Sequence, residues 1–129
     1  GLSTREDAAV MIRPGLAALL IALLAPSSLW AHAYLVKSVP AQRATLYRAP
    51  AKIQLWFNER LEPRYSSFTV SAADGNSIET IKSAVDSGNA KLIFATLKPL
   101  PPGRYLIKFR VLSVDGHVVE DQFPFTIKQ

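Results

Sequence analysis

The chain of 129 residues contains no cysteine and a single methionine, Met11. The absence of cysteine excludes disulfide bonds, thiolate zinc sites and thiol redox chemistry. A glycine-rich phosphate-binding loop is also absent, as is a defensible Ser-His-Asp set. The net charge is +5, but Lys and Arg are spread along the chain instead of forming one cluster. We therefore expect neither a nucleic-acid partner nor a small-molecule substrate.

Long apolar runs are scarce as well, and the clearest one covers residues 15–25. It follows Arg13 and Pro14 and is too short to span a bilayer, which takes roughly 20 residues. Basic start, apolar middle and small residues at the end are typical of a cleavable, helical secretory signal peptide. We expect residues 1–31 to be upstream sequence and signal, and residues 32–129 to be one exported domain. An uncleaved anchor or a buried helix is the alternative.

The cleavage point decides which residue becomes the new N-terminus. Cleavage after Ala31 exposes His32, but it places Leu29 where a small residue is usual. Cleavage after Ala33 fits the small-x-small pattern better and removes His32. From the signal pattern, both positions stay open.

The remaining sequence is rich in short alternating segments separated by Gly, Pro and Asn turns. Period-2 alternation predicts strands with one buried face. Pro124 within the last segment indicates a sheet edge or a bulge. About seven strands predict an all-β protein, an antiparallel two-sheet sandwich or Greek-key barrel. The expected strands cover residues 33–39, 52–57, 67–72, 77–81, 91–97, 104–112 and 123–127.

The stretch Asp115-Gly116-His117 directly follows the most regular of these strands. Gly116 lets the chain turn, and a carboxylate and an imidazole at the end of a rigid strand can point at the same place. Two positions apart, however, they are poorly placed for the carboxylate to orient the imidazole. The plain alternative is a turn in which Asp115 bonds its own backbone and His117 is a surface residue.

Metal binding is the chemistry that these residues offer. If His32 is the N-terminus, its amine and its imidazole can chelate one ion, and His117 and Asp115 add a nitrogen and an oxygen. Three nitrogens and one oxygen suit a tetragonal Cu(II) site. We expect one Cu(II) per mature chain. A Cu(I) site is not expected, because no Met or Cys follows Met11.

Four stretches together resemble the CopC family of periplasmic copper-binding proteins. They are residues 32–41 (HAYLVKSVPA), 53–59 (IQLWFNE), 100–105 (LPPGRY) and 110–119 (RVLSVDGHVV). The resemblance implies an Ig-like or cupredoxin-like β-sandwich. It also implies that His32 is the mature N-terminus and that Cu(II) is held by His32, Asp115 and His117. Some members carry a Met-rich Cu(I) site, which is predicted to be absent here because no Met follows Met11.

The resemblance implies two further points. Glu59 matches the acidic residue of the family's Phe-x-Glu segment, where a carboxylate could hydrogen-bond a ligand and raise its basicity. Members often act with the inner-membrane protein CopD, which here would be a separate chain. The leading hypothesis is a non-enzymatic periplasmic protein for copper sequestration, transport or resistance. A small copper-dependent oxidative enzyme with a histidine-brace site and an Ig-like interaction module without metal are the alternatives.

Overall fold

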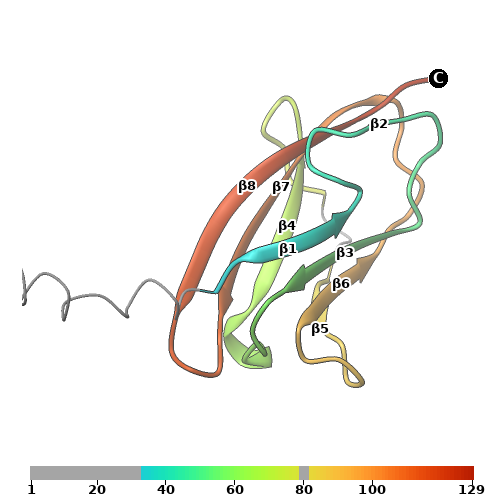
Figure 1. Ribbon diagram of the computed structural model, residues 1–129. Helices are drawn as coiled ribbons and strands as arrows, with labels where there is room; N and C mark the ends of the chain where they lie inside the picture. Colours follow the sequence, from blue (N-terminus) through green and yellow to red (C-terminus); the bar gives the residue numbers. More distant parts are fainter. Residues whose placement is uncertain (1–32, 79–81) are drawn as a thin grey trace, which may run out of the picture. The chain divides into compact units, whose positions relative to one another are not determined.

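Eight strands in the described residues build two facing four-stranded sheets (Figure 1). The computed structural model describes residues 33–78 and 82–129. The predicted signal peptide and His32 lie outside the described residues. The elements are β1 (Leu35–Val39), β2 (Thr45–Leu46), β3 (Lys52–Phe57), the 3-10 helix η2 (Pro63–Tyr65), β4 (Ser67–Ala72), β5 (Ala84–Val85), β6 (Leu92–Thr96), β7 (Gly103–Leu112) and β8 (Val118–Ile127).

The strand order is β1-β3-β6-β5 in the first sheet and β2-β8-β7-β4 in the second. All neighbours are antiparallel except β2 and β8, which pair in parallel over two residues. The predicted all-β sandwich is therefore confirmed. Within the described ranges, no helix is long and apolar enough to cross a membrane.

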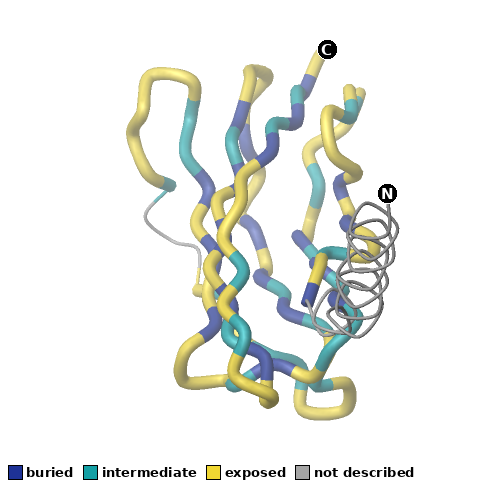
Figure 2. The backbone as a smooth tube through the Cα atoms, turned by 60° about the vertical axis from the view of Figure 1, so that its left-hand side comes forward, coloured by how far each residue is buried: buried dark blue, intermediate teal, exposed yellow. Residues whose placement is uncertain are grey.

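The core lies between the sheets and follows from the alternation of the strands (Figure 2). Along β7 the side chains of Tyr105, Ile107, Phe109 and Val111 are all buried. Phe109 meets Phe57 of the opposite sheet edge-on, with ring centroids 5.4 Å apart. The buried cluster belongs entirely to the compact unit of residues 33–129, so this unit has the core that it needs to fold on its own.

Pro124 is accommodated inside β8 by the direction of its backbone groups. It pairs with Leu106 of β7 in register, but its carbonyl accepts the Arg43 N–H at 2.8 Å on the other side. Groups of one strand residue point to the same side, so the missing N–H removes nothing from the β7–β8 ladder. At Pro124, β8 has no strand on its second side, because β2 pairs with β8 only at Thr126 and Ile127. The edge position predicted from Pro124 is therefore correct at that residue.

The strand predictions were wrong in three places. Residues 77–78 form no strand but a single bridge from Ser77 to Ser71, and residues 79–81 lie outside the described residues. The two-residue strands β2 and β5 were not predicted, since two residues are too short to show a period. Strand β8 begins at Val118, earlier than the alternation of its last residues indicated.

Candidate metal site

The hairpin that joins β7 to β8 carries the predicted pair of side chains. Its backbone is closed by two hydrogen bonds, from Ser113 N to His117 O and from Gly116 N to Ser113 O, both 2.9 Å. Gly116 has φ +95°, a conformation that a residue with a side chain adopts only at a cost. The tight turn therefore fixes the backbone of Asp115 and His117, which flank Gly116.

A buried hydroxyl organises this turn. Ser113 is 1% exposed, and its Oγ accepts the His117 N–H at 3.1 Å. The same hydroxyl donates a hydrogen bond to Asp115 Oδ1. This hydrogen bond from Ser113, and then the contact with His117, hold the pKa of the Asp115 carboxyl below its usual range. Asp115 is consequently an anion at neutral pH, as a metal-ligating carboxylate must be.

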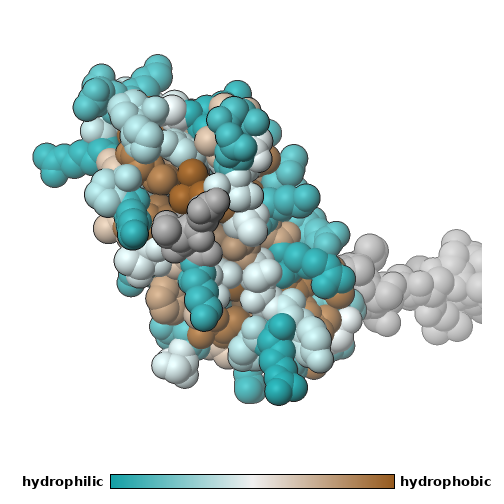
Figure 3. Space-filling model, turned by 180° about the vertical axis from the view of Figure 1, so that it is seen from behind, coloured by the Kyte–Doolittle hydropathy of each residue, from teal (hydrophilic) through white to brown (hydrophobic). Residues whose placement is uncertain are grey.

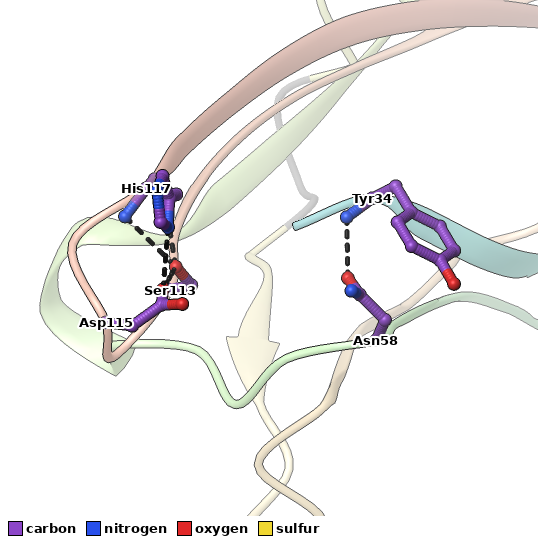
Figure 4. A network of polar contacts seen from close by, with 5 residues as sticks. All are labelled: Tyr34, Asn58, Ser113, Asp115 and His117. Atoms are coloured by element: carbon purple, nitrogen blue, oxygen red, sulfur yellow. Dashed lines mark hydrogen bonds and ion pairs between the residues drawn. The ribbon is translucent and has the colours of Figure 1, made fainter. Parts of the chain in front are cut away.

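The two predicted side chains meet in the hairpin (Figure 4). His117 Nδ1 lies 3.1 Å from Asp115 Oδ1. The carboxylate and the imidazole are therefore in direct contact. This contact confirms the expectation that the two groups can point at one place. The expectation that the carboxylate is poorly placed to orient the imidazole stays a prediction.

The separation of these two atoms also suits a shared metal ion. Nitrogen and oxygen ligands lie about 2.0–2.2 Å from a divalent metal such as zinc. Two such donors at right angles around one ion are then separated by about 2.8–3.1 Å, by simple geometry from those lengths. The 3.1 Å between Nδ1 and Oδ1 is at the upper end of that range. The pair can therefore supply two neighbouring corners of a tetragonal site.

The residues before β1 are hydrogen-bonded at the end of the sandwich that carries the β7–β8 hairpin. Ala33 is buried, and the Tyr34 N–H donates to Asn58 Oδ1 at 2.6 Å (Figure 4). In return, the Asn58 N–H donates to Tyr34 O at 3.2 Å. Asn58 begins the segment of residues 58–62, which we call the linking segment.

The other end of the linking segment bonds to the hairpin. Val114 N donates to Arg60 O, and Glu62 N donates to Leu112 O, both at 2.8 Å. Leu61 also forms a bridge with Ser113. One short segment thus holds both the first described residues of β1 and the hairpin of Asp115 and His117. It belongs to the continuation of β3 in one sheet and contacts β7 of the other.

The four predicted site residues do not all lie together in the described part of the chain. It brings Asp115 and His117 together, whereas His32 lies outside the described residues. Glu59 is half-buried in the linking segment, and its supporting role stays a prediction. Across residues 33–78 and 82–129, no three His, Cys, Asp or Glu side chains come together as a metal site. Asp115 and His117 would need further donors from elsewhere in the chain.

Two residues at the site were not predicted from the sequence. Asn58 precedes the predicted Glu59, and it is the Asn58 side chain that bonds the start of β1. Ser113 stands two residues before Asp115, a spacing at which a serine hydroxyl commonly bonds local backbone and carboxylate groups. The Ser-x-Asp spacing was the available signal for Ser113, whereas nothing in the sequence distinguishes Asn58 from its polar neighbours.

Comparison with known proteins gives a consistent result. Residues 35–128 match the model of the CopC domain. The chain is 37% identical over 113 residues to copper resistance protein C of Xanthomonas campestris pv. juglandis, covering 83% of this chain and 88% of that protein. It is 34% identical over 110 residues to the copper transport protein CutJ of Bacillus subtilis. That match covers 84% of this chain but only 20% of CutJ.

A solved structure agrees in fold. The crystal structure of CopC from Methylosinus trichosporium OB3b superposes with a TM-score of 0.70 at 30% sequence identity, covering 75% of this chain and 94% of that chain. The names of these relatives describe copper resistance or copper transport and not catalysis, in agreement with the prediction of a non-enzymatic protein.

Proposed function

The chain belongs to the CopC family, a family of copper resistance and transport proteins, and on this premise we propose that it is a carrier of one Cu(II) ion per exported chain. The ligands in this proposal are the amine and the imidazole of an N-terminal His32, the carboxylate of Asp115 and the imidazole of His117. Copper is the cargo of the protein, and the chain's own residues bind and release it.

The observation that carries the proposal is the linking segment. It bonds to Tyr34 through Asn58 and to Val114 through Arg60. Ala33, to which His32 is covalently bonded, is buried, and Tyr34 is the residue that the segment holds. This supports a site in which the start of the chain and the hairpin of Asp115 and His117 supply donors to one ion.

The donor set favours the oxidised metal. It contains nitrogen and oxygen atoms only, and Cu(II) heads the affinity order of divalent metals for such ligands. Thioether and thiolate donors, which favour Cu(I), are absent after Met11. We infer that the chain has no Met-rich Cu(I) site.

The proposal includes an export route and a partner. Residues 1–31 contain the signal, cleavage after Ala31 exposes His32, and the mature protein acts in the periplasm. The partner is a copper importer of the CopD type in the inner membrane. Exposed apolar side chains at the end that carries the hairpin support docking of a protein there: Tyr34, Val36, Tyr65, Val114 and Val118.

The test compares three forms of the exported protein in competition titrations with Cu(II). The form that begins at His32 should bind one ion. One extra Gly before His32 removes the amine from the chelate, and His32→Ala removes the imidazole. Each should weaken binding by more than about 100-fold, because loss of even a supporting partner of a metal ligand commonly costs 10–100-fold. Equal affinity of the extended form would exclude the amine as a ligand.

A second measurement addresses the leader. The intact mass of the exported protein, with and without copper, reports the cleavage position and the number of bound ions together. A measured mass equal to that of a chain beginning at Tyr34 would contradict the proposal, since cleavage after Ala33 removes His32.

A further inference from the structure

The charged side chains of the sandwich are divided between its two ends. Six exposed basic residues lie at the end remote from the hairpin, where β3 and β7 begin and β6 and β8 finish. In the described part of the chain, the carboxylate beside them is that of Asp74, which accepts two hydrogen bonds from Asn76. We call these six residues the basic end: Arg43, Arg48, Lys52, Lys98, Arg104 and Lys128.

The half that carries the hairpin is mixed in charge. Its carboxylates lie among basic side chains that include Arg60, Arg64, Lys91, Lys108 and Arg110; Lys108 lines one cavity together with Glu120 and Asp121, and Arg110 is paired with Glu120 at 2.6 Å. The excess of positive charge is therefore at the basic end, and an anionic surface would attract that end more strongly than the other. The six acidic residues are Glu59, Glu62, Asp86, Asp115, Glu120 and Asp121.

A cavity at the basic end is suited to a phosphate group. It measures about 290 Å³ and is lined by two guanidinium side chains together with uncharged residues: Arg43, Arg104, Pro124, Phe125 and Thr126. Arg43 has φ +63°, a strained conformation for arginine, and its N–H bonds to Pro124 O at 2.8 Å. Strain of this kind is often kept where a side chain has a function. The lining contains two arginines and no carboxylate, and guanidinium groups bind phosphate oxygens well.

An exposed aromatic side chain stands beside these charges. Tyr47 is 73% exposed, next to Arg48 in the loop after β2. Tyrosine with basic neighbours suits the boundary between a bilayer and water, where the ring is half apolar and half wet. In Figure 3, the view from behind, hydrophilic side chains project at the upper left, the end at which β8 finishes.

We propose that the basic end docks on the surface of an anionic phospholipid bilayer, with a lipid phosphate between Arg43 and Arg104 and Tyr47 at the interface. The charges come from several chain segments and cover a broad end of the sandwich, whereas single-stranded nucleic acid is bound in a groove with stacked aromatic rings. The half with Asp115 and His117 then points away from the bilayer, so the bilayer-bound protein must leave the surface before its hairpin end can dock on the importer of the proposed function. This arrangement does not depend on copper.

The test measures binding of the protein beginning at His32 to vesicles. Vesicles of phosphatidylcholine mixed with phosphatidylglycerol should bind it, and vesicles of phosphatidylcholine alone should not. The double variant Arg43→Asn and Arg104→Gln should bind the anionic vesicles about 30-fold more weakly, since each basic residue near the surface contributes a factor of about five. Asparagine tolerates the positive φ of position 43. Binding should also weaken as salt is raised.

A matched control removes the same charge elsewhere. Arg64→Gln with Lys91→Gln takes two exposed basic residues from the hairpin half and should change vesicle binding by less than about threefold, because neither residue faces the bilayer. Equal losses in the two double variants would show an effect of net charge alone and would overturn the proposal. Tighter binding to duplex DNA than to anionic vesicles would also overturn it.

Orientation is measured with single cysteines, which the cysteine-free sequence makes specific. A dye at Ala49→Cys, near Tyr47, should become shielded from an aqueous quencher on anionic vesicles, whereas a dye at Ser87→Cys, in the hairpin half, should stay accessible. The reverse pattern would contradict the proposed orientation. If inorganic phosphate raised the thermal stability of the protein but the protein bound no vesicles, the cavity would be a site for small anions only, and bilayer docking would be refuted.

Discussion

Replacing Asn58 by alanine tests whether the linking segment presents the start of the chain to the metal. In the wild-type protein, Asn58 Oδ1 accepts the Tyr34 N–H at 2.6 Å. The substitution removes this acceptor and leaves the backbone bond from Asn58 N to Tyr34 O in place. The residues before β1 should then lose their fixed position, while the sandwich remains folded.

The magnitude follows from one hydrogen bond and one residue of backbone. A neutral hydrogen bond contributes about 0.5–1.5 kcal/mol net, so the free energy of unfolding should fall by about 1 kcal/mol. Copper binding must then order about one more residue, at a cost of about 1–2 kcal/mol. Because 1.4 kcal/mol is a factor of ten, the affinity for Cu(II) should fall about tenfold.

The assay combines urea unfolding with a Cu(II) competition titration of the protein beginning at His32. Asn58→Asp is the matched control, because it keeps an acceptor oxygen for Tyr34 and should retain most of the affinity. In a background that carries both the extra Gly before residue 32 and His32→Ala, and so lacks both donors of that residue, Asn58→Ala should cause almost no further loss of affinity. A full tenfold loss in that background would refute the reasoning.

Three other perturbations follow from the geometry. Ser113→Ala should raise the pKa of Asp115, because the carboxylate loses the hydrogen bond that favours its charged form, so copper affinity should begin to fall at a higher pH than in the wild type; carboxyl NMR titration measures the pKa, and an unmoved value would contradict the cause given. Gly116→Ala and Gly75→Ala both place a side chain at positive φ with no atom within 4 Å, and each should lower stability by about 1–2 kcal/mol in thermal unfolding. Only Gly116→Ala should also weaken copper binding, and equal affinities of the two variants would argue against the hairpin as part of the site. Phe125→Ala should cost about 3–5 kcal/mol in urea unfolding, because this fully buried ring is stacked on a second aromatic residue; a loss below about 1 kcal/mol would mean that the sheets repack around the gap.

The sequence predicted the parts of the fold that have a strong period. Strands β3 and β4 have the expected bounds because apolar side chains alternate over six residues in each. Strands β2 and β5 are held by pairing with a long neighbour and carry no period of their own. After Ala72 the turn is closed by local hydrogen bonds, whereas the chain beyond it meets β4 only through the Ser71–Ser77 bridge and the bond from Ile78 N to Val70 O, which the alternation of residues 77–81 did not indicate.

The candidate site was predictable to the extent that it is local. Asp115 and His117 follow directly from the end of a regular strand and a glycine turn. The contact of Asn58 with Tyr34 depends on the register between β1 and β3, which includes an irregularity between Leu35 and Lys37. Sequence reasoning therefore selected the neighbouring Glu59, whose chemistry was more suggestive but whose position was not known.

The linking segment also has a consequence for how cargo could leave. It extends β3 of one sheet and is hydrogen-bonded to the hairpin that leaves the other sheet. In the proposed site, the donors of residue 32 and those of the hairpin would therefore be supplied from the two sheets. A receptor that binds residues 58–62 and shifts one sheet against the other by about 1 Å would break metal–ligand bonds, which hold to about 0.2 Å, and would release the ion without contacting a ligand.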